Sequence, residues 1–282
     1  MHYSLEKVIA LIGARLFGHH LDAQIDWLLT DSRSLAFPET SLFFALRTKR
    51  NDGHKYIADL YRRGVRNFVV GTVPDHYEEL YPEANFLLVI SPLKALQRLA
   101  ERHREAFSIP IIGVTGSNGK TIVKEWLYQL LSPSMVVTRS PRSYNSQVGV
   151  PLSVCLLNEQ SQIGIFEAGI SQPDEMQTLR AMIQPTIGVM TNIGQAHQEN
   201  FATIDDPVIS DCVQRSLYTG DLLAWSRKDA DSPLFIHTIK KNETSTEIAY
   251  AYLKKNYEMT IPFVDDASIQ NALNALAVCL YL

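Results

Sequence analysis

Residues 113–121 read Gly-Val-Thr-Gly-Ser-Asn-Gly-Lys-Thr, a glycine-rich run that ends in a lysine and a hydroxyl residue. Gly116 and Gly119 would let the backbone curl until its N–H groups point toward phosphate oxygens. Lys120 would contact the β- and γ-phosphates of a nucleotide, and the Thr121 hydroxyl would ligate Mg²⁺. The run therefore predicts a phosphate-binding loop.

The loop departs from the strict phosphate-loop pattern in one place. The pattern G-x-x-x-x-G-K-[ST] needs its first glycine at position 114, where this chain has valine; the glycine lies one residue earlier. A glycine-rich turn with a chance Lys-Thr is the alternative interpretation. The context favours the phosphate loop, because residues 111–114 predict a strand before it and residues 121–131 a helix after it.

Two further groups follow candidate strands. Glu167 ends the apolar run 163–167, where a carboxylate needs a partner or a cation. With Thr121 it could hold one Mg²⁺, because a hard cation prefers oxygen ligands. His197 follows the apolar run 187–191. The alternatives are a surface charge at a strand end for Glu167 and a packed or exposed histidine for His197.

From residue 111 onward, strands alternate with helices, which predicts a mostly parallel sheet covered on both faces. Ligands of such sheets sit beyond the carboxyl ends of the strands. The phosphate loop and Glu167 fall at such ends. The candidate strands are 111–114, 135–138, 163–167, 187–191, 221–225 and 234–239.

The residues before this region predict a smaller α/β unit. Ser108-Ile109-Pro110 breaks the pattern, so we expect two domains, 1–107 and 108–282. The chain ends on an apolar helix over 268–282, from which we expect a longer parent protein. The elements expected in the first domain are helices at 4–13, 54–63 and 92–107 and strands at 27–29, 42–46, 68–70 and 86–90.

Composition excludes several classes of protein. Hydrophobic residues make up 46% and charged residues 20%, so a disordered, collagen-like or coiled-coil chain is excluded. The net charge of −4 gives no global attraction to nucleic acid, and no apolar run reaches the ~18 residues of a membrane span. The three cysteines form no pair motif, which favours reduced thiols. We expect a cytoplasmic monomer.

The loop at 112–121 resembles that of the Mur ligases of peptidoglycan synthesis and of the related folylpolyglutamate synthetases. The N-terminal third resembles the UDP-sugar-binding domain of the Mur ligases that add D-alanyl-D-alanine, the MurF type. The resemblance begins near residue 24 and runs to the end of the chain. The other motifs that carry it are Asp31-Ser32-Arg33, Ser41–Leu46, Asp52-Gly53-His54, Val148–Leu152, Glu167-Ala168-Gly169 and Thr191–His197.

The resemblance implies a reaction and a domain plan. ATP would phosphorylate the carboxylate of UDP-MurNAc-tripeptide, and D-Ala-D-Ala would attack the acyl-phosphate to give UDP-MurNAc-pentapeptide, ADP and phosphate. Residues 1–107 would be the UDP-sugar-binding domain and 108–282 the P-loop ATPase domain. The family's third domain, which binds the amine, would be absent from this chain, so the chain alone would be inactive.

The resemblance also assigns roles to residues. The catalytic residues would be Lys120, Glu167 and His197, and the metal ligands Thr121, Glu167 and His197. ATP would contact Gly116, Ser117, Asn118, Gly119, Lys120, Thr121 and Asn271, and the UDP-sugar substrate would contact Ser32, Arg33 and Asn145.

This chain departs from the family pattern in two places. The family's His-Asn pair before the adenine-side asparagine is replaced by Ala267 and Ser268. The family also carries a lysine, often carbamylated, that helps to hold a second metal, yet no lysine occurs between Lys124 and Lys228. The segment 198–220 therefore lacks an expected metal ligand.

Three interpretations remain open at this point. The first is the ATP-dependent carboxylate–amine ligase. The second is a P-loop kinase or NTPase, although no arginine cluster follows residue 125. The third is a non-catalytic module that binds a nucleotide or a UDP-sugar, which the missing lysine favours. Residues 31–33 could likewise be only a turn at a strand end.

Overall fold

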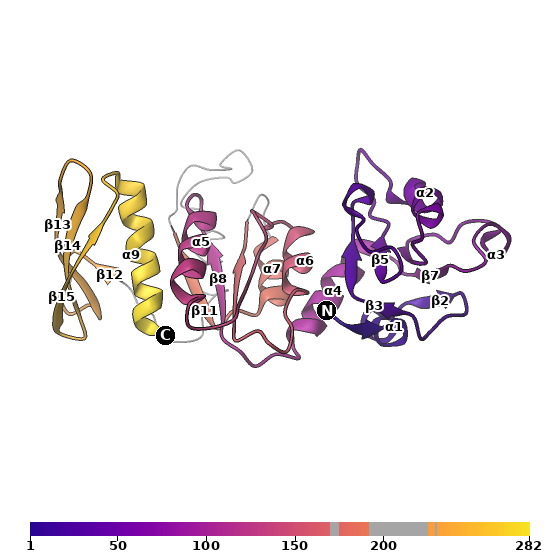
Figure 1. The fold of residues 1–282 in the computed structure, drawn as a ribbon, viewed down its shortest axis with the longest axis horizontal. Helices are drawn as coiled ribbons and strands as arrows, with labels where there is room; N and C mark the ends of the chain where they lie inside the picture. Colours follow the sequence, from indigo (N-terminus) through magenta and orange to yellow (C-terminus); the bar gives the residue numbers. More distant parts are fainter. Residues whose placement is uncertain (170–174, 192–224, 229) are drawn as a thin grey trace. The chain divides into compact units, whose positions relative to one another are not determined.

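The computed structural model describes residues 1–169, 175–191, 225–228 and 230–282. The described chain divides into two compact units (Figure 1). The first unit is Met1–Ser108 with Gln147–Asn158, and the second is Ile109–Ser146 with Glu159–Leu282. His197 and the segment 198–220 lie outside the described residues.

The first unit is built on a five-stranded sheet in the order β2-β7-β6-β5-β4. The edge strand β2 is antiparallel to β7 and the other pairs are parallel. Phe43, Phe68 and Phe86 fill its core and are fully buried. The strands are β2 (Arg15–Phe17), β4 (Trp27–Leu29), β5 (Ser41–Phe44), β6 (Asn67–Val70) and β7 (Asn85–Leu88), and β1 (Tyr3–Ser4) pairs separately with β3 (Gln24–Ile25).

The helices of this unit begin and end where the capping residues predict. Helix α1 (Leu5–Ile12) follows Ser4, whose side chain accepts a hydrogen bond from Lys7 N, and it ends at Gly13 with a φ of 69°. Helix α4 (Pro92–Arg104) begins after Ser91 with proline at its first position, as expected. The expected helix at 54–63 divides into a 3₁₀ turn and an α-helix. The remaining helices are η1 (Ser32–Ser34), η2 (Gly53–Tyr56), α2 (Ile57–Arg62), α3 (Tyr77–Leu80) and α6 (Gly149–Val154).

The second unit contains a four-stranded sheet in the order β11-β8-β10-β9, and all of its pairs are parallel. This confirms the predicted α/β class with a parallel sheet. Glu167 lies opposite Val114 and Met190 opposite Thr115, so the ends of β10, β8 and β11 meet at one edge. The elements are β8 (Ile111–Thr115), α5 (Lys120–Leu131), β9 (Val137–Arg139), β10 (Ile163–Glu167), α7 (Glu175–Ile183) and β11 (Ile187–Met190).

A second sheet of this unit, in the order β12-β13-β14-β15, is antiparallel except for its first pair. The predicted strand at 234–239 is present but belongs to this separate sheet. The sequence did not predict β14 and β15, because their connection, Leu253-Lys254, has φ of 47° and 65° without the usual asparagine or glycine. The strands are β12 (Trp225–Ser226), β13 (Leu234–Lys241), β14 (Thr246–Tyr252) and β15 (Lys255–Ile261). The strand expected at 221–225 is described only from residue 225.

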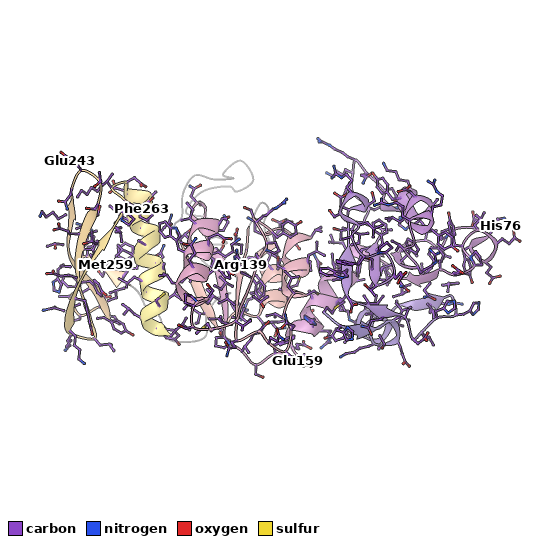
Figure 2. The ribbon with its side chains drawn as sticks, viewed as in Figure 1. His76, Arg139, Glu159, Glu243, Met259 and Phe263 are labelled. Atoms are coloured by element: carbon purple, nitrogen blue, oxygen red, sulfur yellow. The ribbon has the colours of Figure 1, made fainter. Side chains whose placement is uncertain are left out.

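Helix α9 (Asp266–Tyr281) lies between α5 and the antiparallel sheet (Figure 1). Its Ala275 and Val278 join the core of the parallel sheet, while Ile269 and Leu273 join the core of the antiparallel sheet. Phe263, labelled in Figure 2, stacks on Trp126 of α5 with ring centroids 4.9 Å apart. The helix therefore joins the two sheets of the second unit.

Two expectations from composition can be compared with the fold. Within the described ranges, no helix is both long and apolar enough to cross a membrane. Cys155 and Cys279 are free thiols, and Cys212 lies outside the described residues. Burial raises the pKa of the Cys155 thiol to about 12, so this cysteine packs as an apolar residue.

The core beneath α5 leads to a stability prediction. Leu127 is fully buried, whereas Leu130 on the same helix is 58% exposed. We expect Leu127→Ala to lower the free energy of unfolding by about 2–5 kcal/mol, because it leaves a cavity. Leu130→Ala is the matched control and should change it by less than about 0.5 kcal/mol. Urea unfolding followed by tryptophan fluorescence measures both, and equal effects would contradict the packing of α5.

Candidate functional site

The loop between β8 and α5 has the backbone shape that its glycines allow. Gly116 has a φ of 129° and Gly119 a φ of 84°, both in the region that favours glycine. A Cβ on Gly119 would also lie 2.3 Å from Asn271 Oδ1. Conformation and space therefore both require glycine at position 119.

The base of the loop is hydrogen-bonded to the strands on both sides. The Thr115 hydroxyl donates to the Ala168 carbonyl, 3.0 Å away, beyond the end of β10. The Thr191 hydroxyl, at the end of β11, donates to the carbonyls of Thr115 (3.3 Å) and Asn118. These contacts hold the loop at the edge where the parallel strands end. Thr191 is the first residue of the motif Thr191–His197, but sequence reasoning gave it no role, although a hydroxyl residue directly after a strand was a signal.

Lys120 is the first residue of α5 and folds back over the loop. Its Nζ donates to the carbonyls of Gly116 (2.6 Å) and Ser117 (3.4 Å). Burial lowers the pKa of the Lys120 amino group, and the negative charge of Glu167 acts in the opposite direction. A cation and the positive end of α5 thus meet at the loop, which is an arrangement that attracts phosphate.

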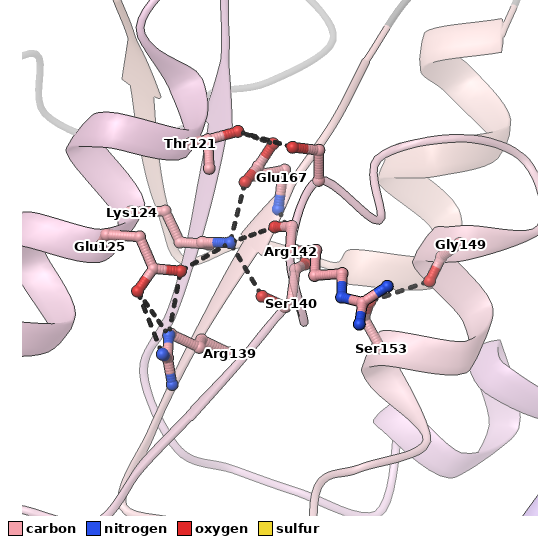
Figure 3. A network of polar contacts seen from close by, with 10 residues as sticks. Thr121, Lys124, Glu125, Arg139, Ser140, Arg142, Gly149, Ser153 and Glu167 are labelled. Carbon is pink, nitrogen blue, oxygen red and sulfur yellow. Dashed lines mark hydrogen bonds and ion pairs between the residues drawn. The ribbon is translucent and has the colours of Figure 1, made fainter.

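Thr121 and Glu167 lie side by side, as the sequence predicted (Figure 3). The Thr121 hydroxyl donates to Glu167 Oε2 at 3.1 Å and lies 3.2 Å from the Ser143 hydroxyl. Glu167 is fully buried at the end of β10, which rules out the alternative of a surface charge.

These oxygens fit the requirements of Mg²⁺. The ion binds through one or two protein oxygens and keeps phosphate oxygens or waters as its other ligands. Thr121 Oγ1 and Glu167 Oε2 are such oxygens, whereas Glu167 Oε1 faces the amino group of Lys124 at 3.0 Å. Among the residues that the structure describes, no three His, Cys, Asp or Glu side chains cluster as metal ligands. The site therefore suits a hard cation shared with a ligand better than an all-protein metal cage.

Lys124 is a residue of this site that sequence reasoning missed. Its side chain is fully buried, and its Nζ lies 3.0 Å from Glu167 Oε1. It follows Lys120 by one helical turn, so the i, i+4 spacing on the face of α5 toward the sheet was an available signal. Ser140, also buried, accepts from Lys124 Nζ through its carbonyl and from Glu167 N through its hydroxyl.

The two predicted asparagines of this unit lie against the glycines of the site. Asn271 on α9 is 7% exposed and packs on Gly119. A Cβ on Gly169, two residues after Glu167, would lie 2.8 Å from Asn145 Cγ, and Gly169 N donates to the Asn145 carbonyl at 2.9 Å. Both asparagines thus border the loop or the carboxylate.

Ser32 and Arg33 lie in the first unit, in the 3₁₀ turn η1. Asp31 caps this turn by accepting from Arg33 N at 3.0 Å, and the Arg33 guanidinium pairs with Asp31 at 2.6 Å. Hydrogen bonds from Arg33 lower the pKa of Asp31 to about 2. The turn that the alternative interpretation expected is present, and the 88% exposed Arg33 side chain is open to solvent.

The third predicted catalytic and metal-binding residue, His197, lies outside the described residues. The structure therefore brings together Lys120, Thr121, Glu167, Asn145 and Asn271, and leaves the position of His197 open.

The fold and the loop are those of a P-loop protein of the α/β class. Residues 114–212 match the Mur ligase middle domain family. A relative from Bacillus subtilis (strain 168), a UDP-N-acetylmuramoyl-tripeptide–D-alanyl-D-alanine ligase, is 32% identical over 180 residues, which are 64% of this chain and 38% of the relative. Over the matched residues, the chain is similar to the Mur ligase family.

Solved structures agree in fold. A MurF structure from Acinetobacter baumannii matches with a TM-score of 0.86 at 23% identity, over 99% of this chain and 64% of that one. MurF ligase from Thermotoga maritima in complex with ADP matches with a TM-score of 0.75 at 23% identity, over 90% of this chain and 62% of that one. In fold, the chain is thus similar to ligases of the MurF type.

The contact between Gly119 and Asn271 leads to a second prediction. Gly119→Ala should destabilise the second unit, because alanine at a positive φ costs about 1–2 kcal/mol and its Cβ collides with the asparagine. In an Asn271→Ala background the collision disappears and only the backbone cost remains. Urea unfolding of the four proteins should therefore show a smaller effect of Gly119→Ala in that background. Equal effects would contradict the packing of Asn271 on the loop.

Proposed function

We propose that this chain carries the ATP-binding and UDP-sugar-binding parts of an ATP-dependent ligase that joins a carboxylate to an amine. The observation that carries the proposal is the pairing of Thr121 with the buried Glu167 beside the phosphate loop, in a chain similar to the Mur ligase family. That pairing supports a nucleotide–Mg²⁺ site at the end of the parallel strands.

Each residue of the loop has a proposed task. Backbone N–H groups of residues 116–119 and the amino group of Lys120 would bind the phosphates of ATP. Thr121 and Glu167 would hold Mg²⁺, whose chemistry at this place is to neutralise charge on phosphate oxygens. Asn271, packed against Gly119, would contact the nucleotide from α9. The ADP complex of the related Thermotoga maritima ligase supports ATP as the nucleotide.

The proposed substrates come from the names of the relatives. We propose UDP-MurNAc-tripeptide as the carboxylate and D-Ala-D-Ala as the amine, joined through an acyl-phosphate. The first unit, with Ser32 and Arg33, would bind the UDP-sugar, and Asn145 would contact substrate near Glu167. His197 would help to hold a second metal. The free thiols of Cys155 and Cys279 support a cytoplasmic location.

The first test of this proposal is the affinity for ATP. Lys120→Ala removes the cation that folds over the loop, and hydrogen bonds to charged groups contribute about 1.5–3 kcal/mol. We therefore expect ATP to bind roughly ten- to hundredfold more weakly. Calorimetric titration with ATP and Mg²⁺ measures this, and Lys255→Ala, an exposed lysine on β15, is the matched control. Equal affinities of wild type and Lys120→Ala would refute the loop assignment.

A second test concerns the whole reaction. Residues 1–282 should bind UDP-MurNAc-tripeptide and ATP but form no pentapeptide with D-Ala-D-Ala, because the chain spans only 64% of the length of the Acinetobacter baumannii MurF structure that it matches. Positioning of the nucleophile contributes up to ~7–11 kcal/mol of a barrier, so its loss removes measurable turnover. Mass spectrometry of the products decides, and pentapeptide formed by these residues would contradict this prediction.

The binding measurement also distinguishes the ligase from the alternative of a P-loop kinase, because a kinase would not bind the UDP-sugar.

A further inference from the structure

The amino group of Lys124 is fully buried and closely surrounded by oxygen atoms. It lies among four oxygens: Glu167 Oε1 and Glu125 Oε1, both at 3.0 Å, and the carbonyls of Ser140 (2.9 Å) and Arg142 (Figure 3). An ammonium has three protons. The two carbonyls accept hydrogen bonds from it, and the two carboxylates form ion pairs with it.

This arrangement gives the two oxygens of Glu167 different surroundings. Oε1 faces the ammonium of Lys124, whereas Oε2 accepts from the Thr121 hydroxyl at 3.1 Å. The backbone N–H of Glu167 donates to the Ser140 hydroxyl, which holds the end of β10. A fully buried carboxylate with one fixed oxygen cannot rotate freely, so the other oxygen stays directed at Thr121.

The charged side chains around Lys124 form a chain of ion pairs. Arg139 pairs with Glu125 at 3.0 Å, and Glu125 in turn pairs with Lys124. Two cations and two carboxylates therefore alternate from the half-buried Arg139 to the fully buried Glu167. Without Lys124, the buried Glu167 carboxylate would lose its ion pair, and breaking a buried ion pair is strongly unfavourable.

We propose that Lys124 is a positioning residue of the nucleotide site: it holds Glu167 in the orientation in which the carboxylate can bind Mg²⁺ beside Thr121. The inference rests on the proposed function, because it needs Mg²⁺ at this carboxylate. Lys124 itself touches neither nucleotide nor metal. Its amino group cannot carry a metal-binding carbamate in this position, since that anion would lie among two carboxylates and two carbonyl oxygens.

The test compares the affinity for ATP in excess Mg²⁺ with that in EDTA; the ratio is the magnesium response. Loss of a group that orients a metal ligand lowers metal affinity by ~10–100-fold, so Lys124→Met should lose most of the response. Its affinity in EDTA should stay that of the wild type, because Lys120 and the loop are untouched. Lys255→Met, a lysine exposed on β15, is the matched control and should keep the full response.

A double variant separates positioning from a general structural role. If Lys124 acts through Glu167, Lys124→Met/Glu167→Gln should have the same magnesium response as Glu167→Gln alone. Losses that add, or a wild-type response in Lys124→Met, would overturn the inference while leaving the proposed function standing. A wild-type chain without any magnesium response would instead overturn the proposed function, and this inference with it.

Folding of the variants is also informative. Breaking a buried ion pair is far more damaging than replacing both partners by neutral groups. If circular dichroism shows that Lys124→Met does not fold, the double variant decides the question. Recovery of its fold supports Lys124 as the counter-ion of Glu167, and failure of the double variant to fold overturns it.

Discussion

The burial of one carboxylate, Glu167, at the end of a central strand is the constraint on which the second unit depends. A charge removed from water needs a partner, and here the partner is the equally buried Lys124, 3.0 Å away. That pair requires α5 to run directly over the sheet, one turn beyond the phosphate loop. It also requires the segment after β9 to supply the Ser140 and Arg142 carbonyls. The loop, the helix and the strand ends are thus held by one electrostatic arrangement.

Helix α9 also stabilises the loop between β8 and α5. Its apolar residues enter two cores, and its Asn271 packs against Gly119 of the loop. Asn274, one turn further along, accepts from Trp225 Nε1 at 3.0 Å and donates to the Thr191 carbonyl. A helix some 150 residues beyond the phosphate loop therefore shapes that loop. The second sheet serves the site indirectly, because it covers the opposite face of α9.

Short sequence patterns predicted several helix ends and the loop between β8 and α5. The caps Ser4 and Ser91 and the stop at Gly13 each act through the few residues beside them, so a reading of neighbouring residues found them. The phosphate loop was found for the same reason. The hairpin of β14 and β15 was not found, because Leu253-Lys254 adopts a positive φ without a residue type that favours it. Only the pairing of the flanking strands stabilises that turn.

The sequence by itself determined the α/β class, the capped helices, the phosphate loop and the types of group that could meet there. The alternation of strands with helices, the capping residues and the glycine content are properties of short segments. They can therefore be recognised without knowledge of the fold. Tertiary structure alone decided that Lys124 is buried, because a lysine in a helix is ordinarily exposed and only the position of β10 places a carboxylate beside it. It also decided that Asn271 packs against Gly119. Such contacts join residues tens to hundreds of positions apart, and their distances depend on how whole elements pack rather than on any local pattern.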